Sequence, residues 1–429
     1  MERLLIGPPS CPSQQGPRTT RRPTIADSSA RPGETRGVAV LVHAYYEEDS
    51  RVRREAEALV RGGLPVDVFA LRRPGEAPTG VLDGVTIHRL DVRRHQGAGI
   101  AVYIREYLDF FVRATFALAR AHRTCRFALV HVNTLPDFLV FAALPLKLAG
   151  VPVLLDLHES MPEFFRARFP RRASPFAHGL LRLQERASIA AADAVVTVND
   201  ALRDRLVALG TPAAKVTVVL NAPDLALFDP SAHPARSFMA DGVLRLVYAG
   251  ALTPTYEVDV AIEALARLAE ARPGLSAVLE IYGRGDADAA LRSRAAELGV
   301  ADRVRFHGRI PLELVPGAIA GADIGLAPTR QTEFTDFSLS TKLFEYAVMG
   351  KPAVASALPT VARYFGPETI STYRPGDARD LARAVLALFE DPTARAARVA
   401  ATAARARELG WDGEARRYCA LVERLAGLA

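Results

Sequence analysis

The sequence predicts an α/β protein built from two doubly wound, Rossmann-like domains with a cleft between them. From residue 37 onward, short apolar runs alternate with longer amphipathic stretches, the pattern of a parallel sheet flanked by helices. These runs form two series separated by a proline-containing stretch. The length of 429 residues also exceeds one ordinary domain.

The first series contains apolar runs that we expect to be strands, at residues 38–42, 65–70, 85–90, 128–132, 153–157, 194–198 and 216–220. Helices fit between them, for example at residues 51–62, 136–148 and 201–209. A second series of expected strands follows, at residues 244–249, 277–282, 304–307, 324–327, 353–356 and 369–372.

These patterns divide the chain into five segments. Residues 1–36 are rich in Pro, Ser, Thr and Arg and are expected to be a disordered tail. A first domain at 37–225 and a second at 242–410 are joined by a linker at 226–241. Residues 411–429 are expected to form a C-terminal helix that packs back on the first domain.

Composition narrows the class of protein. Hydrophobic residues make up 49% and charged residues 24%, which is typical of a globular protein. Neither a membrane-spanning run nor the apolar core of a signal peptide is apparent, and the few cysteines have no metal-ligand spacing, so we expect a cytoplasmic protein. The net charge of +6 suits phosphorylated molecules or anionic lipid, whereas nucleic acid is not expected because no basic patch is interleaved with aromatics.

Ligands of open α/β sheets bind beyond the carboxyl ends of the strands. In the first domain the residues there are polar and suit a hydroxylated ligand or acceptor: His43, Asn133, His158 and Glu159. In the second domain they are mostly small, which suits a backbone close to phosphates: Gly250, Gly283 and Gly285. Tight strand-to-helix turns explain such glycines equally well.

The segment 335–356 is the most informative. Ser340 and Thr341 lead into a helix, where free amides and hydroxyls can hold an anion. Lys342 and Glu345 are three residues apart and share a face, so they suit a diphosphate and a ribose diol respectively. A surface ion pair is the alternative.

Two other interpretations are weaker. The pair Gly283 and Gly285 lacks the third glycine of a dinucleotide fingerprint, which disfavours a dehydrogenase. Asp286 and Asp288 resemble a metal motif, but acids in the first turn of a helix complement its dipole. We expect no metal ion and no other cofactor.

The run STKLFEYAVMGKPAVAS resembles the nucleotide-binding segment of the family 4 retaining glycosyltransferases of the GT-B fold. VYAGALTPTYEVDVAIEAL, LEIYGRGD and DRVRFHGRIP resemble other parts of their second domain, and LLDLHESMPEFF resembles the first-domain segment that faces the donor sugar. The resemblance implies a nucleotide-sugar donor on the second domain, an acceptor on the first, retention of configuration, no metal, and cleft closure. It implies that Glu345 contacts the ribose and His158 the donor sugar.

The chain departs from the family pattern at the diphosphate site. Phe337 stands where a first glutamate often contacts the donor sugar, and Ala251 and Tyr256 stand where Arg and Lys are usual. Neutralisation of the diphosphate is therefore left to Lys342, with Arg330 or Arg284 as further candidates.

The function expected from this resemblance is sugar transfer to a hydroxyl of a sugar, lipid or small molecule, in cell-surface polysaccharide, glycolipid or natural-product glycosylation. A nucleotide-sugar epimerase of the same fold and a non-catalytic binding protein are the alternatives. Residues 164–186 interleave Phe and Leu with Arg, which predicts peripheral contact with an anionic membrane, on the inner face of the cell membrane.

Overall fold

The computed structural model describes residues 36–428 except residues 96–98, 170, 171, 173, 224, 226 and 235. The chain divides into two units, Met1–Thr35 and Arg36–Ala429, and all that follows concerns the second. The expected tail, apart from Arg36, lies outside the described residues.

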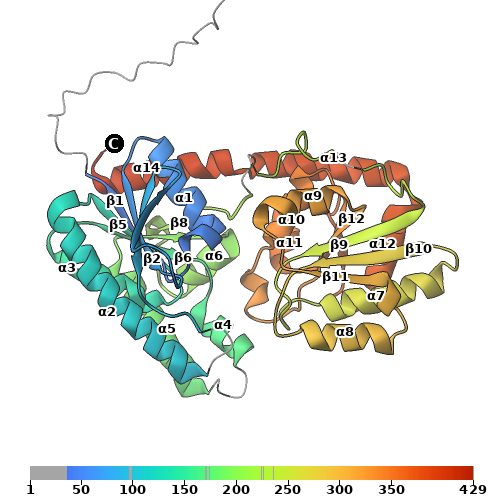
Figure 1. Ribbon diagram of the computed structural model, residues 1–429, viewed down its shortest axis with the longest axis horizontal. Coiled ribbons are helices and arrows are strands. Elements are labelled where there is room, and N and C mark those ends of the chain that lie inside the picture. Colours follow the sequence, from blue (N-terminus) through green and yellow to red (C-terminus); the bar gives the residue numbers. More distant parts are fainter. Residues whose placement is uncertain are drawn as a thin grey trace, which may run out of the picture. The chain divides into compact units, whose positions relative to one another are not determined.

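The fold contains two separate sheets, which confirms the predicted class (Figure 1). The first sheet has the order β3-β4-β2-β1-β5-β6-β7-β8, and only the β3–β4 pair is antiparallel. Its strands are β1 (Val38–Leu41), β2 (Val66–Leu71), β3 (Thr79–Leu82), β4 (Val85–Leu90), β5 (Leu129–Asn133), β6 (Val153–Leu157), β7 (Ala194–Thr197) and β8 (Val216–Val218).

The second sheet is parallel throughout and has the order β11-β10-β9-β12-β13-β14. Its strands are β9 (Val243–Ala249), β10 (Ser276–Tyr282), β11 (Val304–Gly308), β12 (Ile324–Ala327), β13 (Ala353–Ser356) and β14 (Ser371–Tyr373). The strand order reverses between β1 and β5 and again between β9 and β12, and such switch points are where α/β sheets bind ligands.

Each sheet is buried on both faces by helices. In β1, Val38 and Val40 belong to one apolar cluster, and Ala39 and Leu41 belong to another, as alternation along a strand requires. The first-domain helices are α1 (Ser50–Arg61), α2 (Ile100–Cys125), α3 (Leu144–Leu148), α4 (Met161–Arg168), α5 (Pro175–Ala191) and α6 (Asp200–Ala208). The second-domain helices are α7 (Val258–Ala271), α8 (Asp288–Glu297), α9 (Val315–Ala320), α10 (Thr341–Val348), α11 (Pro359–Tyr364) and α12 (Ala378–Glu390).

Two local predictions were wrong. The helix expected at 136–148 is split into the 3-10 helix η2 (Asp137–Ala143) and α3, because Pro145 lacks the amide that a continuous helix needs. The strand β3 was not predicted, since its four residues lie at a sheet edge and are partly exposed.

The last two helices, α13 (Pro392–Glu408) and α14 (Trp411–Ala426), carry the chain back to the first sheet. Helix α13 contacts α10 and α12, whereas α14 contacts α1 and β5 (Figure 1). Trp411 and Tyr418 of α14 join the apolar cluster beside β1, and the Tyr418 hydroxyl lies 2.9 Å from His131 Nδ1. Within the described residues, no helix is both long and apolar enough to span a bilayer.

Candidate functional site

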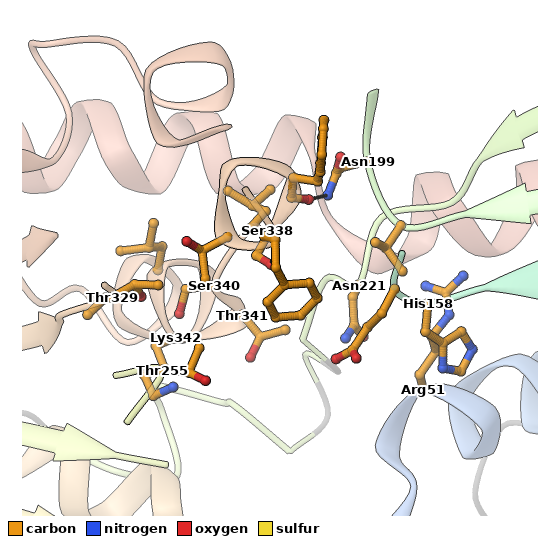
Figure 2. A pocket seen from close by; sticks show the side chains of 18 of the residues that line it. Arg51, His158, Asn199, Asn221, Thr255, Thr329, Ser338, Ser340, Thr341 and Lys342 are labelled. Atoms are coloured by element: carbon orange, nitrogen blue, oxygen red, sulfur yellow. Dashed lines mark hydrogen bonds between the residues drawn. The ribbon is translucent and has the colours of Figure 1, made fainter. Parts of the chain in front are cut away.

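A cavity of about 520 Å³ lies between the carboxyl ends of the two sheets. Figure 2 shows its two walls, with Ser340, Thr341 and Lys342 on one side and Arg51 and His158 on the other. Both walls lie beside the strand-order reversals, so the fold brings the two expected ligand edges together.

The second-domain wall is built around the start of α10. Ser340 is the residue before its first turn, and no side chain caps the helix. The amides of that turn therefore lack a side-chain acceptor, and the hydroxyl residues Ser338, Ser340 and Thr341 line the cavity beside them. A helix start of this kind favours an anion such as a phosphate.

Lys342 supplies the positive charge of this wall. Its side chain is only 8% exposed, and its ammonium lies 4.5 Å from the centre of the Tyr256 ring and 5.1 Å from that of Tyr248. Gly250 makes room for it, because a Cβ at that position would lie 2.5 Å from Lys342 Cε. Among the described residues Lys342 forms no ion pair within 4.0 Å, although its charge acts on the Glu345 carboxyl and opposes the rise in pKa that burial causes there. An anionic ligand at the helix start could therefore still pair with this ammonium.

His158 follows β6 on the opposite wall. Its Nε2 lies 3.1 Å from Asp156 Oδ2 and 3.2 Å from Asn133 Oδ1, and its backbone amide donates to Thr134. Burial lowers the pKa of His158, but the charge and hydrogen bond of Asp156 outweigh it, so the pKa lies above its ordinary value. The imidazole is therefore held in one orientation, and its cationic form is more stable than that of an ordinary histidine.

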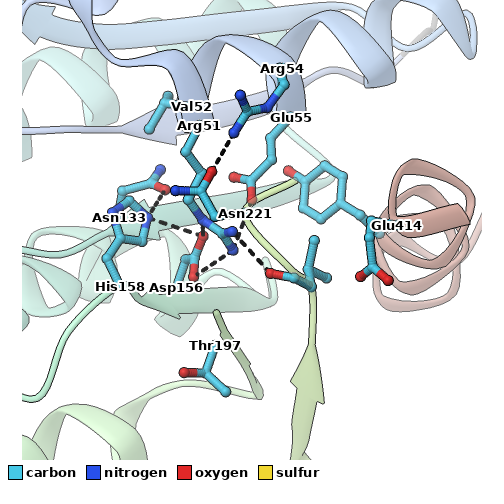
Figure 3. Close-up of polar contacts among 12 residues, drawn as sticks. Arg51, Val52, Arg54, Glu55, Asn133, Asp156, His158, Thr197, Asn221 and Glu414 are labelled. Carbon is cyan, nitrogen blue, oxygen red and sulfur yellow. Dashed lines mark hydrogen bonds and ion pairs between the residues drawn. The ribbon is translucent and has the colours of Figure 1, made fainter. Parts of the chain in front are cut away.

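Asp156 is fixed in turn by Arg51, from the first turn of α1 (Figure 3). The guanidinium donates to both carboxylate oxygens at 2.8 and 3.1 Å, and to the Val219 carbonyl at 3.0 Å. Burial alone would raise the pKa of Asp156, but Arg51 and His158 hold it well below its usual range. Arg51 also lines the cavity, so this buried pair supports the first wall from behind.

Some of the expected donor-binding residues line the cavity, and others lie outside its lining. Phe337, Ser340, Thr341 and Lys342 line the cavity. Glu345 lies one turn further along α10, half-buried and outside the cavity lining, and burial raises the pKa of its carboxyl.

The glycines expected at the donor make close packing contacts, and their approach to a phosphate stays a prediction. A Cβ at Gly283 would lie 1.8 Å from the Gly250 carbonyl oxygen, and one at Gly285 would lie 2.0 Å from that of Leu252. These glycines, like Gly250, let neighbouring loops and side chains pack closely and do not border the cavity.

The two arginine candidates also lie outside the cavity lining. Arg330 lies 3.2 Å from Asp259 and 3.9 Å from Glu257, so acids already balance its charge. Arg284 has an exposed side chain.

The acceptor-side candidates also separate. Glu159 lines the cavity beside His158, and burial raises its pKa. Asn133 is fully buried and lines neither this cavity nor an adjoining one, and its amide contacts His158 and the Leu41 carbonyl. His43 faces that adjoining cavity, with its Nε2 3.2 Å from Glu106.

Sequence reasoning missed Arg51, Asp156 and the role of the Tyr256 ring. An aspartate in the apolar run of β6 was a usable signal, because a buried acid needs a partner. The partner itself lies 105 residues away and has no local signature.

The described residues hold one set of side chains close enough to bind a metal, namely Glu55, His131 and Asp156, whose ligand atoms lie within 4.8 Å of one another. Arg51 pairs with both of these carboxylates and supplies positive charge there. Burial raises the pKa of Glu55 to about 8 and lowers that of His131 to about 4. Asp288 lies in the first turn of α8, as the dipole interpretation predicts, whereas Asp286 precedes the helix and pairs with Arg168 instead.

Two family descriptions match the chain. Residues 49–222 match the Glycosyl transferase 4-like domain, and residues 244–391 match Glycosyl transferases group 1. A D-inositol 3-phosphate glycosyltransferase of Kineococcus radiotolerans is 26% identical over 84% of this chain and 86% of its own length. Another, of Thermomonospora curvata, is 29% identical over 61% of this chain and 64% of its own length. A glycogen synthase of Mycobacterium tuberculosis is 30% identical over 50% and 49% respectively.

Solved structures share the fold. Sucrose-phosphate synthase from Thermosynechococcus elongatus superposes with a TM-score of 0.74 at 18% identity, covering 92% of this chain and all of that one (100%). Anabaena Alr3699/HepE in complex with UDP-glucose gives 0.67 at 15% identity, over 90% and 99% of the two chains. WaaG, a glycosyltransferase involved in lipopolysaccharide biosynthesis, gives 0.67 at 16% identity over 90% and 99%.

Proposed function

We propose that the transferred sugar lies between His158 and Lys342 and keeps its anomeric configuration. The chain belongs to the family 4 glycosyltransferases. The sugar comes from a nucleotide-sugar donor. The observation that carries the proposal is a buried ammonium at an uncapped helix start, facing a histidine paired with a carboxylate across the cavity.

The donor is oriented by the two walls. The diphosphate takes the amides at the start of α10, the hydroxyls of Ser340 and Thr341, and the ammonium of Lys342. The ribose hydroxyls contact the carboxylate of Glu345. This half-buried residue lies one turn after Thr341 in α10, so its side chain has to extend back toward the nucleotide. The sugar then points toward His158 and Glu159 on the first wall.

The chemistry needs stabilisation of the leaving group above all. As the glycosidic bond breaks, negative charge grows on the diphosphate, and Lys342 and the helix start stabilise it electrostatically. The acceptor hydroxyl attacks from the face that the leaving group vacates, and a phosphate oxygen takes its proton. Neither a metal ion nor a covalent intermediate enters this scheme.

The acceptor is a hydroxyl compound held on the first domain, in polysaccharide, glycolipid or natural-product glycosylation at the cytoplasmic face of a membrane. The membrane contact expected from residues 164–186 falls on only part of that stretch. Arg166 pairs with Glu333 and Arg168 lies 2.9 Å from Asp286, so α4 faces the second domain. Arg171 lies outside the described residues, whereas α5 exposes Phe176, Leu180 and Leu183.

Two variants separate binding from turnover. Lys342→Met keeps the apolar stem of the side chain but removes the charge, so it should weaken UDP binding in calorimetry and lower the rate of UDP release from UDP-glucose. His158→Ala should keep UDP affinity and lose turnover. Unchanged UDP affinity in Lys342→Met would refute the diphosphate assignment. A changed sugar in the presence of donor alone would instead indicate an epimerase.

A further inference from the structure

A second cavity, of about 740 Å³, opens into the first-domain wall of the site. It shares five lining residues with the first cavity, namely Ala44, Asp49, Arg94, His158 and Glu159. A molecule that fills it would therefore touch the same histidine and glutamate that we place beside the donor sugar. Its volume is that of a site for a molecule of several hundred daltons.

The walls of this second cavity are mostly apolar. They come from α2, η2, α4 and α5, and include Ile104, Tyr107, Phe138, Phe165, Phe169 and Leu181. A purely polar acceptor such as a cyclitol or a free sugar would leave these side chains in contact with water. Covering apolar side chains with a hydrocarbon removes them from water, which is favourable, so the walls favour a hydrocarbon.

Polar groups line the end that is shared with the donor site, and Arg168 and Gln184 add polar groups from α4 and α5. At the shared end the cavity meets the carboxyl ends of β1, β5 and β6, with Thr134, His158 and Glu159. His43 is held at this end by Glu106 and packs edge-on against Tyr107, with ring centres 4.8 Å apart. The cavity thus has one polar end for a hydroxyl and apolar walls for the rest of the acceptor.

The mouth of the cavity is also apolar, although it faces solvent. Ile104 of α2 and Leu180 of α5 line the cavity, yet their exposed fractions are 53% and 57%. Exposed apolar residues continue from both, with Leu108 one turn along α2 and Phe176, 82% exposed, one turn back along α5. Charged side chains on the same two helices include the exposed Arg105 and the half-buried Asp109 on α2 and the exposed Arg186 on α5.

We propose that this second cavity binds the hydrocarbon chain of a lipid acceptor, whose hydroxyl-bearing head lies at His158 and Glu159. The proposal rests on the function proposed above and names its acceptor class. A soluble aromatic acceptor would be covered within the cavity and would leave the exposed mouth unexplained. A lipid chain leaving between Ile104 and Leu180 would cover this mouth, and the arginines would favour an anionic bilayer.

The test uses dodecyl maltoside below its micellar concentration as the lipid-like probe and 1-naphthyl glucoside as the soluble aromatic probe. The double variant Ile104→Asn/Leu180→Asn changes two exposed side chains, so it should fold. Leu314→Asn is the matched control, since Leu314 is exposed on the second domain outside both cavities. UDP affinity, measured in every variant, reports on the donor site independently.

We expect dodecyl maltoside to bind the full chain more tightly than 1-naphthyl glucoside, and the double variant to weaken it about tenfold. The control and the UDP affinity should stay unchanged. Phosphatidylglycerol vesicles should bind the wild-type chain at low salt and bind the double variant less. Equal binding of dodecyl maltoside by wild type and double variant, or preference for 1-naphthyl glucoside, would overturn the lipid assignment while leaving the donor site intact. Failure of the wild-type chain to bind UDP would instead count against the proposed function.

Discussion

Gly250→Ala tests whether the position of Lys342 matters for sugar transfer. The added Cβ would lie 2.5 Å from Lys342 Cε, 2.7 Å from its Nζ and 3.1 Å from the Tyr248 hydroxyl. Non-bonded carbon atoms need about 3.5–4.0 Å, so the lysine has to move by roughly 1 Å or more. The obstacle is the flexible end of a side chain rather than backbone, so the fold should survive.

The expected effect follows from that displacement. A misplacement of about 1 Å at a reacting group can cost about a hundredfold in rate, which corresponds to roughly 2.7 kcal/mol of transition-state stabilisation. The free energy of unfolding should change by less than about 1 kcal/mol, because the lysine can swing toward the open cavity. Gly250→Ala should therefore lower kcat far more than it lowers stability.

The assay is UDP release from UDP-glucose, with urea unfolding measured in parallel. Gly413→Ala is the control substitution, because a Cβ there meets nothing within 4 Å. It should leave the rate close to that of the wild type and raise the free energy of unfolding by at most about 1 kcal/mol, because alanine favours the helix more than glycine does. Full activity in Gly250→Ala, combined with low activity in Lys342→Met, would refute the geometric reasoning. It would show that the charge of Lys342 is needed but that its packing against Gly250 does not position it.

Two further predictions concern Glu345 and Asp156. Glu345→Ala should weaken UDP binding about 10- to 100-fold, since a charged hydrogen bond is worth about 1.5–3 kcal/mol. In calorimetry the variant should also lose any tighter binding of UDP than of 2′-deoxy-UDP. If it still binds UDP more tightly, the ribose assignment is wrong. Asp156→Asn should move the basic limb of the kcat–pH profile to lower pH, because the charge and hydrogen bond of Asp156 raise the pKa of His158. An unshifted kcat–pH profile would limit Asp156 to a structural role. In the wild type, the contribution of this pair to folding stability is fully present below the ordinary histidine pKa. It is lost as the pH rises through the raised pKa of His158.

The sheets were predictable because buried parallel strands are continuous apolar runs. The run at 153–157 is β6, and the run at 353–356 is β13. Where burial is partial, the signal fails, as at the edge strand β3. Proline decides locally, so Pro145 could have indicated the break before α3.

In the site, residues that are close in sequence were predictable, whereas partners that are distant in sequence were not. The second-domain wall is local in sequence, so Ser340, Thr341 and Lys342 were found together. The support of His158 is not local, because Asp156 and Arg51 meet across 105 residues. Glycines after strands serve close packing and phosphate approach alike, and the contacts of Gly283 show the close packing.

Retention is the central claim about the chemistry, and the configuration of the released sugar tests it most directly. UDP-glucose, whose sugar is α-linked, is incubated with the protein alone, and early hydrolysis is followed by proton NMR before the anomers equilibrate. We predict α-glucose as the first product, released more slowly by Lys342→Met. Initial release of β-glucose would contradict the account, because it would require attack from the opposite face of the sugar.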